Sequence, residues 1–207
     1  DVVTRADIAS EKLIVEGIRK AFPTHSIRTE EAGVIEGSDP RYLWIIDPVD
    51  GTVNFSRGIP LWGISIALHF EGKPLVAAVN LPKLGELYTA SKGGGAFMNG
   101  KAIHVSRESD SVHAIVSNGD FNVGDAQKIN EQNSRNFARE AVAFERVKCL
   151  GAFAKDPLLI SAMMTCGHFF VSKRYNGKKP WSVPISAMVS PQCISSAISC
   201  SLSLNFI

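Results

Sequence analysis

The stretch that decides the fold runs Leu43-Trp44-Ile45-Ile46-Asp47-Pro48-Val49-Asp50-Gly51-Thr52. Its first four residues form a compact apolar run, which predicts a buried strand. The strand ends at Asp47, where a carboxylate is costly unless it is paired or bound to a metal. Asp50 follows three residues later, across a turn that contains proline and glycine. The stiffness of proline and the freedom of glycine allow both carboxylates to face one point.

Further oxygen and N–H groups gather at this turn. The Val49 carbonyl lies between the two aspartates and can face the same point. Hard oxygen donors of this kind suit Mg²⁺ or Mn²⁺. The backbone N–H groups of Gly51 and Thr52 can hold an anion if a helix or a nest of amides begins there. A cation beside amide donors is what binding of a phosphate monoester needs. The alternative interpretation of this segment is a structural turn or a calcium loop. The residue spacing of an EF-hand calcium loop is absent.

Two adjacent acids, Glu30-Glu31, follow a short extended segment over residues 25–27. Adjacent acids are most often solvated. One of them can nevertheless close a third side of the metal site, which would leave Thr52 to orient a water molecule.

Bulk composition excludes several classes of protein. The 207 residues are 45% hydrophobic and 20% charged, as expected for a soluble globular protein. A net charge of +2 gives no reason to expect nucleic acid or an acidic membrane surface. The sequence contains no run of 18 apolar residues, so no membrane span is predicted. The four cysteines form no Cys-x-x-Cys pair, so zinc is not expected. We expect their thiols to be reduced, as in a cytoplasmic protein.

The pattern before the acidic turn predicts a helix that Pro23 ends. Its apolar face consists of Ile8, Leu13, Ile14, Ile18, Ala21 and Phe22, with Glu11, Lys12, Arg19 and Lys20 off that face. Residues 33–41 read as a polar loop. After the turn, strands are predicted over residues 63–68, 75–79, 86–90 and 95–98, with Asn99-Gly100 as a hairpin turn. Farther on, strands are expected over residues 112–117 and 147–151, and helices over residues 125–143 and 158–164.

A longer part of the sequence resembles a known family. Residues 44–55, Trp-Ile-Ile-Asp-Pro-Val-Asp-Gly-Thr-Val-Asn-Phe, look like the first signature of the inositol monophosphatase superfamily. Residues 1–7 resemble its Asp-x-Val-Thr-x-x-Asp segment, and Thr29-Glu30-Glu31 resembles its Gly-Glu-Glu. Residues 94–100 resemble its Gly-Ala-Phe-x-Asn-Gly hairpin. The resemblance is strong from Asp1 to about Ser106, weaker through residues 119–120 and 147–152, and poor beyond.

This resemblance implies an α/β fold, the layered αβαβα sandwich of the inositol monophosphatase and fructose-1,6-bisphosphatase type. Residues 1–106 would be an N-terminal α+β half that carries the metals. Residues 107–207 would be a smaller α/β half, divergent after about residue 156 and atypical or incomplete at its end. Family members are commonly homodimers.

The resemblance also implies a site. Two or three Mg²⁺ ions, or Mn²⁺ as an alternative, would be held by Glu30, Asp47, Asp50 and the Val49 carbonyl. Glu30, Asp47 and Thr52 are thereby expected to be catalytic, with Glu30 and Thr52 positioning a water that attacks phosphorus. The amides of Gly51 and Thr52 would hold phosphate oxygens of a small phosphorylated metabolite.

The sequence departs from the family pattern at its second signature, where the family has Trp-Asp. Here Ser182 follows Trp181, and no Asp or Glu occurs after Asp156. A serine hydroxyl is a far weaker Mg²⁺ ligand than a carboxylate. The family's one or two helices before the Asp-x-Val-Thr segment are also missing, so a fragment, an isoform and an altered reading frame at the 3′ end all fit.

Two classes of function therefore stay open. The first is Mg²⁺-dependent hydrolysis of a small phosphate monoester resembling inositol monophosphate. The second is an impaired family member or fragment that acts as a phosphate-binding, metal-binding or regulatory chain. Histidinol phosphate and bisphosphorylated nucleotides or sugars are alternative substrates for the first class.

Overall fold

The computed structural model describes residues 4–104, 115–118 and 127–151. Its elements in chain order are α1 (Arg5–Ala21), β1 (His25–Arg28), β2 (Val34–Ile35), β3 (Asp39–Asp50), α2 (Thr52–Ser56), β4 (Gly63–Phe70), β5 (Lys73–Leu81), β6 (Glu86–Ser91), β7 (Gly95–Met98), β8 (Lys101–Ile103), β9 (Ile115–Asn118), α3 (Gln127–Ala143) and β10 (Arg146–Cys149). Among these residues no helix is both long and apolar enough to span a membrane.

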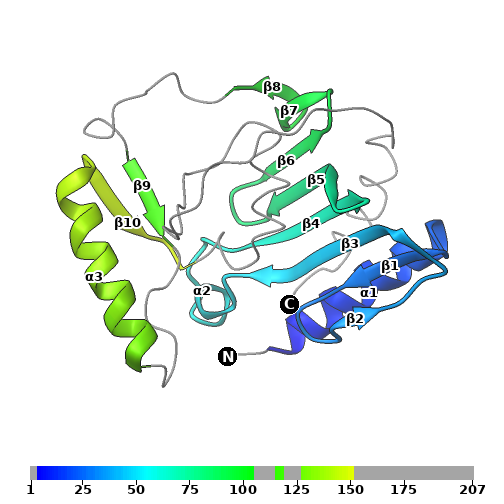
Figure 1. The fold of residues 1–207 in the computed structure, drawn as a ribbon, viewed down its shortest axis with the longest axis horizontal. Coiled ribbons are helices and arrows are strands. Elements are labelled where there is room, and N and C mark those ends of the chain that lie inside the picture. The colour runs from blue at the N-terminus through cyan, green and yellow to red at the C-terminus, as the bar shows by residue number, and fades with distance from the viewer. Residues whose placement is uncertain (1–3, 105–114, 119–126, 152–207) are drawn as a thin grey trace.

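Eight strands form one sheet in the order β2-β1-β3-β4-β5-β6-β7-β8. β1 runs parallel to β3, whereas every other neighbouring pair is antiparallel. Figure 1 shows this sheet extending from β1 and β2 to β7 and β8, with α1 beside β1 and β3. Because β3 has a neighbour on both sides, the acidic turn at its end starts from a fixed position.

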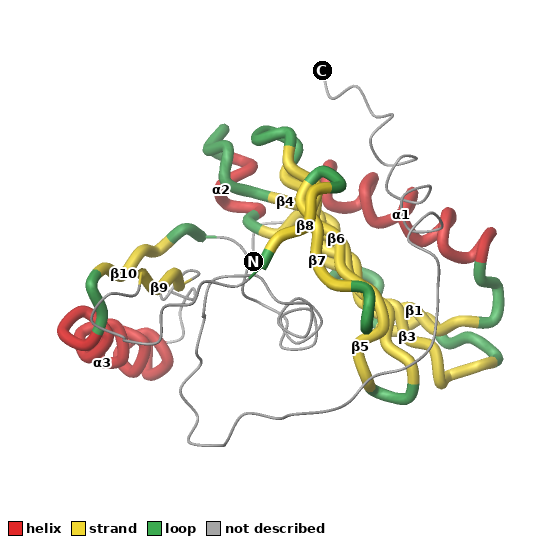
Figure 2. The backbone as a smooth tube through the Cα atoms, turned by 90° about the horizontal axis from the view of Figure 1, so that it is seen from above, coloured by secondary structure: helices red, strands yellow, loops and turns green. Residues whose placement is uncertain are grey.

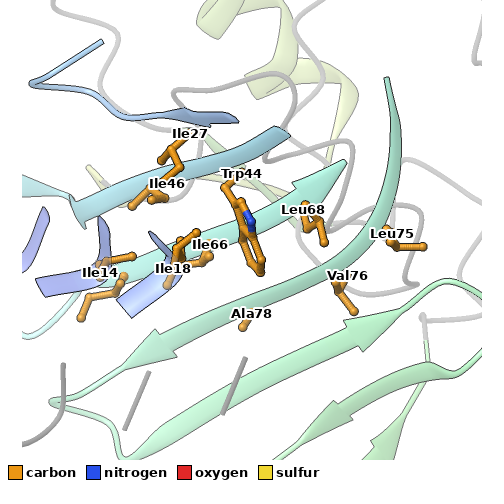
Figure 3. Close-up of a cluster of buried hydrophobic side chains, with 11 residues drawn as sticks. Ile14, Ile18, Ile27, Trp44, Ile46, Ile66, Leu68, Leu75, Val76 and Ala78 are labelled. Carbon is orange, nitrogen blue, oxygen red and sulfur yellow. The ribbon is translucent and has the colours of Figure 1, made fainter. Parts of the chain in front are cut away.

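Helix α1 covers one face of the sheet (Figure 2). Ile14 and Ile18 are 0% and 1% exposed and belong to the same buried cluster as Trp44, Ile46 and Leu68 (Figure 3). Full burial of one such side chain stabilises a fold by about 1.5–3 kcal/mol. The other face carries a smaller cluster: Ile45, Ala67 and Ala77, with Leu43 packed against it.

A second, smaller sheet follows along the chain. β9 and β10 pair in parallel, with Ile115 opposite Arg146, and α3 precedes β10. Two parallel strands joined through a helix are the usual form of a βαβ unit. No side chain of α3 is buried, and Figure 1 places this helix on the outer side of β9 and β10.

The predicted strands after the turn are confirmed, with slightly longer bounds in β4, β5 and β6. The Asn99-Gly100 hairpin turn is confirmed as well. Met98 pairs with Lys101, and both turn residues have positive φ, 48° for Asn99 and 77° for Gly100. This is the conformation of a type I′ turn, whose twist matches that of the flanking strands.

The apolar face predicted for the first helix is partly wrong. Ile8 is 59% exposed, whereas Glu11, which was predicted off the face, is only 7% exposed. The buried residues of α1 are Asp7, Ser10, Glu11, Ile14 and Ile18. Residues spaced by three and four share one helical face, so this face is polar in its first half and apolar in its second half.

The polar loop predicted over residues 33–41 is also partly wrong. β2 lies within it, and β3 already begins at Asp39. Ile35 of β2 pairs with Ile27 of β1, which gives this short segment an apolar contact to a core strand. The helix expected over residues 158–164 and the segment around Ser182 lie outside the described residues. The division into two halves near residue 106 stays a prediction.

Candidate metal and phosphate site

The two aspartates of the acidic turn lie on the same face of the sheet because β3 carries one extra residue. Asp47 pairs with Ser65 of β4 and Asp50 pairs with Gly63, so three steps along β3 match two steps along β4. Such a bulge shifts the alternation of side chains along a strand. Residues two apart share a face, and so do cross-strand partners. The register thus places both aspartates on one face of the sheet, whereas the convergence of their carboxylates on one point stays a prediction.

Both aspartates are buried at this position. Asp47 and Asp50 are 7% and 6% exposed, and Val49 between them is 3% exposed. The Val49 N–H donates to Oδ1 of Asp47 over 3.2 Å. Buried carboxylates require hydrogen bonds, a cation or both. The chemistry of this pair therefore fits a divalent cation with hard oxygen ligands.

The structure places Thr52 directly beside the turn. Its hydroxyl oxygen lies 3.0 Å from the Val49 carbonyl oxygen and 3.2 Å from Oδ1 of Asp7. A hydroxyl has one proton to donate and two lone pairs that accept. When Thr52 donates to the Asp7 carboxylate, its lone pairs can accept a hydrogen bond from a water molecule.

Gly51 is the residue at which the acidic turn leads into α2. Its φ is 89° and its ψ is 43°, a left-handed conformation that favours glycine. Gly51 is the N-cap residue of α2, and without a side chain it cannot cap the first amides of the helix. The predicted binding of a small anion by the Gly51 and Thr52 amides stays a prediction.

The Glu30–Glu31 loop follows the end of β1. Both glutamates are exposed, while Thr29 before them is buried. The Thr29 N–H donates to the Gly33 carbonyl over 2.8 Å, and the Thr29 hydroxyl accepts from the Ala32 N–H over 3.1 Å. These two bonds make the loop a compact turn.

The predicted three-acid set is not assembled in this structure. Across residues 4–104, 115–118 and 127–151, no three His, Cys, Asp or Glu side chains form a group that could hold one metal ion. The structure therefore brings Asp47, Val49, Asp50, Gly51 and Thr52 together at one turn, with Glu30 on a separate loop. The assignment of Glu30 as a metal ligand stays a prediction.

Sequence reasoning missed three buried side chains on α1 that contact the site loops. Asp7 contacts Thr52, the Ser10 hydroxyl donates to the Pro48 carbonyl over 3.1 Å, and Glu11 accepts from amides of the Glu30–Glu31 loop. A signal was present, because the three polar residues share the helical face that continues into Ile14 and Ile18.

Asn54 connects α2 to the smaller sheet. Its buried Nδ2 donates to the Leu61 carbonyl over 2.7 Å and to the Leu150 carbonyl over 2.6 Å. Leu150 directly follows β10, and Gly151 next to it would meet Asn54 if it carried a Cβ. The second sheet is therefore fastened to the helix that begins at the acidic turn.

Comparison with known proteins gives a consistent family. The inositol monophosphatase family model matches residues 1–166. The Nus factor SuhB of Pasteurella multocida is 34% identical over 190 residues, which cover 91% of this chain and 68% of that protein. The inositol-1-monophosphatase of Mesorhizobium japonicum is 40% identical over 119 residues, which cover 58% of this chain and 45% of that protein.

Solved structures agree with this result. The inositol monophosphatase of Anabaena has a TM-score of 0.67 at 36% identity, covering 72% of this chain and 58% of that chain. An IMPase/NADP phosphatase complexed with Mg²⁺ and phosphate has a TM-score of 0.62 at 28% identity, covering 73% of this chain and 55% of that chain. The predicted α/β fold class is confirmed. The chain spans about two thirds or less of the length of these relatives.

Proposed function

This chain belongs to the inositol monophosphatase family, and on that basis we propose that it hydrolyses a small-molecule phosphate monoester with the help of Mg²⁺. Inositol monophosphate is the first substrate to test. The observation that carries the proposal is the buried pair Asp47 and Asp50 on one face of the sheet, beside the Thr52–Asp7 hydrogen bond. The residues that would bind the metal thus lie on one turn, and Thr52 beside them contacts Asp7 of α1.

The residues that would hold the cation are Asp47, Asp50, the Val49 carbonyl and Glu30. Carboxylates and a backbone carbonyl are the oxygen ligands that Mg²⁺ accepts, with water completing its shell. Two or three ions can share such a set, and Mn²⁺ is an alternative with similar preferences. A cation bound there would lower the pKa of coordinated water and would neutralise charge on the phosphate.

Thr52 and Asp7 would handle the proton of the attacking water. The Thr52 hydroxyl accepts a hydrogen bond from that water while it donates its own proton towards Oδ1 of Asp7. The Asp7 carboxylate is 3% exposed, so bulk water competes little for this bond. Glu30 would orient the same water from its loop after β1.

The amides at the start of α2 would hold the phosphate. Gly51 and Thr52 offer N–H groups next to the two aspartates, and N–H groups at a helix start favour negative charge. A phosphate oxygen placed there lies beside the cation ligands, so the monoester is held from two sides.

A metal titration with matched variants tests the proposal. Phosphate release from inositol monophosphate, histidinol phosphate and a sugar bisphosphate is measured against Mg²⁺ for the full chain, Asp47→Asn and Asp39→Asn. Asp39 lies on the same strand but is bonded to Arg41 at the far end, so its variant is the control. We expect Asp47→Asn to abolish turnover and Mg²⁺ binding. Unchanged Mg²⁺ affinity in Asp47→Asn would refute the site.

A second candidate function is favoured by one observation at the sequence level. Ser182 stands where the family signature has aspartate, and no acid follows Asp156. A chain without that ligand would bind metal or phosphate but turn over slowly, as a binding or regulatory chain. Absence of hydrolysis by the unchanged chain, with recovery in Ser182→Asp, would support this candidate. Turnover by the unchanged chain at millimolar Mg²⁺ would exclude it.

We also propose that the chain forms a homodimer and is located in the cytoplasm. Its proposed partner molecule is a small phosphorylated metabolite. Light scattering coupled to size-exclusion chromatography measures the mass of the particle directly. A single-chain mass of 22.4 kDa across the micromolar range would contradict the dimer.

A further inference from the structure

Helix α1 turns a polar face towards the site. Asp7, Ser10 and Glu11 are 3%, 3% and 7% exposed. Their spacing of three and four residues places them side by side on the helix. Burial of polar groups costs free energy unless each one is hydrogen-bonded. The hydrogen-bond partners of these three side chains therefore indicate the role of this face.

Glu11 binds the loop that carries Glu30. Its Oε2 accepts from the Glu31 N–H over 3.1 Å, and its Oε1 accepts from the Ala32 N–H over 3.2 Å. A carboxylate that accepts two backbone amides makes charge-assisted bonds, which are stronger than neutral ones. The Thr29 bonds shape the loop internally, whereas the Glu11 bonds join it to α1.

The preceding turn of α1 binds the other part of the site. The Ser10 hydroxyl donates to the Pro48 carbonyl over 3.1 Å, and Asp7 accepts from Thr52 over 3.2 Å. The acidic turn and the Glu30–Glu31 loop are thus both fastened to one helix. A shift of either loop relative to α1 would stretch these hydrogen bonds.

We infer that Glu11 is a positioning residue for the metal site. Its carboxylate fixes the Glu30–Glu31 loop on α1, and α1 also holds the turn with Asp47 and Asp50. Glu11 thereby sets where Glu30 lies relative to the two aspartates. The inference rests on the proposed function, because it takes Glu30 as a metal ligand.

Three variants separate position from charge. Glu11→Ala removes both acceptor oxygens. Glu11→Gln keeps the length of the side chain and one acceptor oxygen but loses the charge. Glu11→Asp keeps the charge, but it is one methylene shorter and cannot reach both amides. If position is what matters, the aspartate variant behaves like the alanine variant, and the glutamine variant lies between alanine and the unchanged chain.

Two measurements on the full chain test the positioning role of Glu11 without relying on turnover. Amide hydrogen exchange by NMR reports the Glu31 and Ala32 N–H groups in the absence of metal. Calorimetric titration with Mg²⁺ reports the dissociation constant. We expect Glu11→Ala to speed exchange of both amides and to raise the dissociation constant about 10- to 100-fold, as loss of an outer-shell partner of a metal site does.

Ile18→Val is the control for a general loss of stability. Ile18 lies on the same face of α1, two turns further on, and packs in the core. It should lower the unfolding midpoint without changing the Mg²⁺ dissociation constant or the exchange of the two amides. An unchanged dissociation constant in Glu11→Ala would overturn the inference, and so would a normal constant in Glu11→Asp.

The two proposals fail in different ways. If the unchanged chain binds no Mg²⁺, the proposed function fails, and the exchange of the Glu31 and Ala32 amides still decides whether Glu11 holds the loop. Unchanged exchange in both Glu11→Ala and Glu11→Gln would show that it does not. If the unchanged chain binds Mg²⁺ and Asp47→Asn does not, the site stands, and only the Glu11 variants can then contradict the positioning role.

Discussion

The hydroxyl oxygen of Thr52 lies 3.2 Å from Oδ1 of Asp7, and this bond joins the start of α2 to the first turn of α1 across 45 residues. Asp7 also accepts from the backbone N–H of Thr4 over 2.9 Å and from the Thr4 hydroxyl. Its Oδ2 thus belongs to the capping box of α1, whereas its Oδ1 contacts Thr52 at the candidate site. One carboxylate therefore has a structural and a chemical partner at once.

Removal of the Thr52 hydroxyl is expected to slow turnover without preventing metal binding. Thr52→Val keeps the shape of the side chain but cannot pass a proton to Asp7, so the turnover number should fall about 100-fold or more. Thr52→Ser keeps the hydroxyl and should retain most activity. Steady-state phosphate release at saturating Mg²⁺ measures both.

Thr4→Ala is the control for the structural part of Asp7. It removes the cap of α1, which costs about 0.5–2 kcal/mol of stability, and it leaves Oδ1 of Asp7 bonded to Thr52. Asp7→Asn should lower turnover, whereas Thr4→Ala should lower only the unfolding midpoint. Equal turnover losses in the two variants would contradict the proton-accepting role of Asp7.

A methyl group at Gly151 is expected to disturb the contact between the smaller sheet and α2. A Cβ there would lie 3.0 Å from Asn54 Oδ1, and the φ of +69° adds backbone strain. Gly72→Ala is the matched control, because its φ is +73° and a Cβ at that position would meet nothing within 4 Å. Urea unfolding should show a loss of about 1–2 kcal/mol for Gly72→Ala and a larger loss for Gly151→Ala. Equal losses would mean that Asn54 moves aside freely.

Loss of the Ser10 hydroxyl is expected to destabilise the acidic turn. Ser10→Ala removes a buried hydrogen bond to the Pro48 carbonyl and should cost about 1 kcal/mol or more. Ser56 provides the comparison, because its hydroxyl donates over 2.9 Å to the Val53 carbonyl in an exposed position. Ser56→Ala should change the free energy of unfolding little. A cost for Ser56→Ala as large as that for Ser10→Ala would argue against burial as the cause.

His25 is expected to make stability depend on pH. It accepts from Trp44 Nε1 at Nδ1 over 3.1 Å and stacks on Tyr42 with ring centroids 4.3 Å apart. Burial lowers the pKa of His25 below its usual 6.5, although the attraction of Asp39 acts in the opposite direction. The unfolded chain then takes up the proton at a higher pH than the folded chain. The contribution of neutral His25 to the free energy of unfolding is complete above pH 6.5. It is lost as the pH falls from 6.5 towards the folded-state pKa.

His25→Phe tests this pH dependence. The phenyl ring retains the stacking and does not titrate, so unfolding free energies between about pH 7.5 and 5 should fall less steeply than in the unchanged chain. The exposed His104 is the control residue, as His104→Gln. Identical slopes for His25→Phe and the unchanged chain would contradict the prediction.

The strand and the acidic turn could be predicted from the sequence, whereas part of the site geometry could not. The apolar run before Asp47 and the Pro48 and Gly51 positions were sufficient to predict a strand followed by a turn with two inward carboxylates. The bulge that places Asp47 and Asp50 on one face could not be read from the sequence, because it depends on the register against β4. Periodicity favoured the apolar Ile8 for the buried face of α1.

Glu11 shows why periodicity failed at that point. A charged residue is normally assigned to the solvent side of a helix, since its burial is costly. Its partners are two backbone amides, and amides carry no signature in the sequence. They are 20 and 21 residues away in the chain, so they come within reach only after the sheet has folded.

The two hydrogen bonds of Asn54 have a consequence for the order in which the chain folds during synthesis. The Leu61 carbonyl is seven residues away and leaves the ribosome almost together with Asn54, whereas the Leu150 carbonyl is 96 residues away. At the usual elongation speed, the second partner arrives roughly 5–20 s later. During that interval the Asn54 side chain has only its local bond to the Leu61 carbonyl. The contact between α2 and the smaller sheet would then form late, after the acidic turn has already made its bonds to residues 7 and 10 of α1.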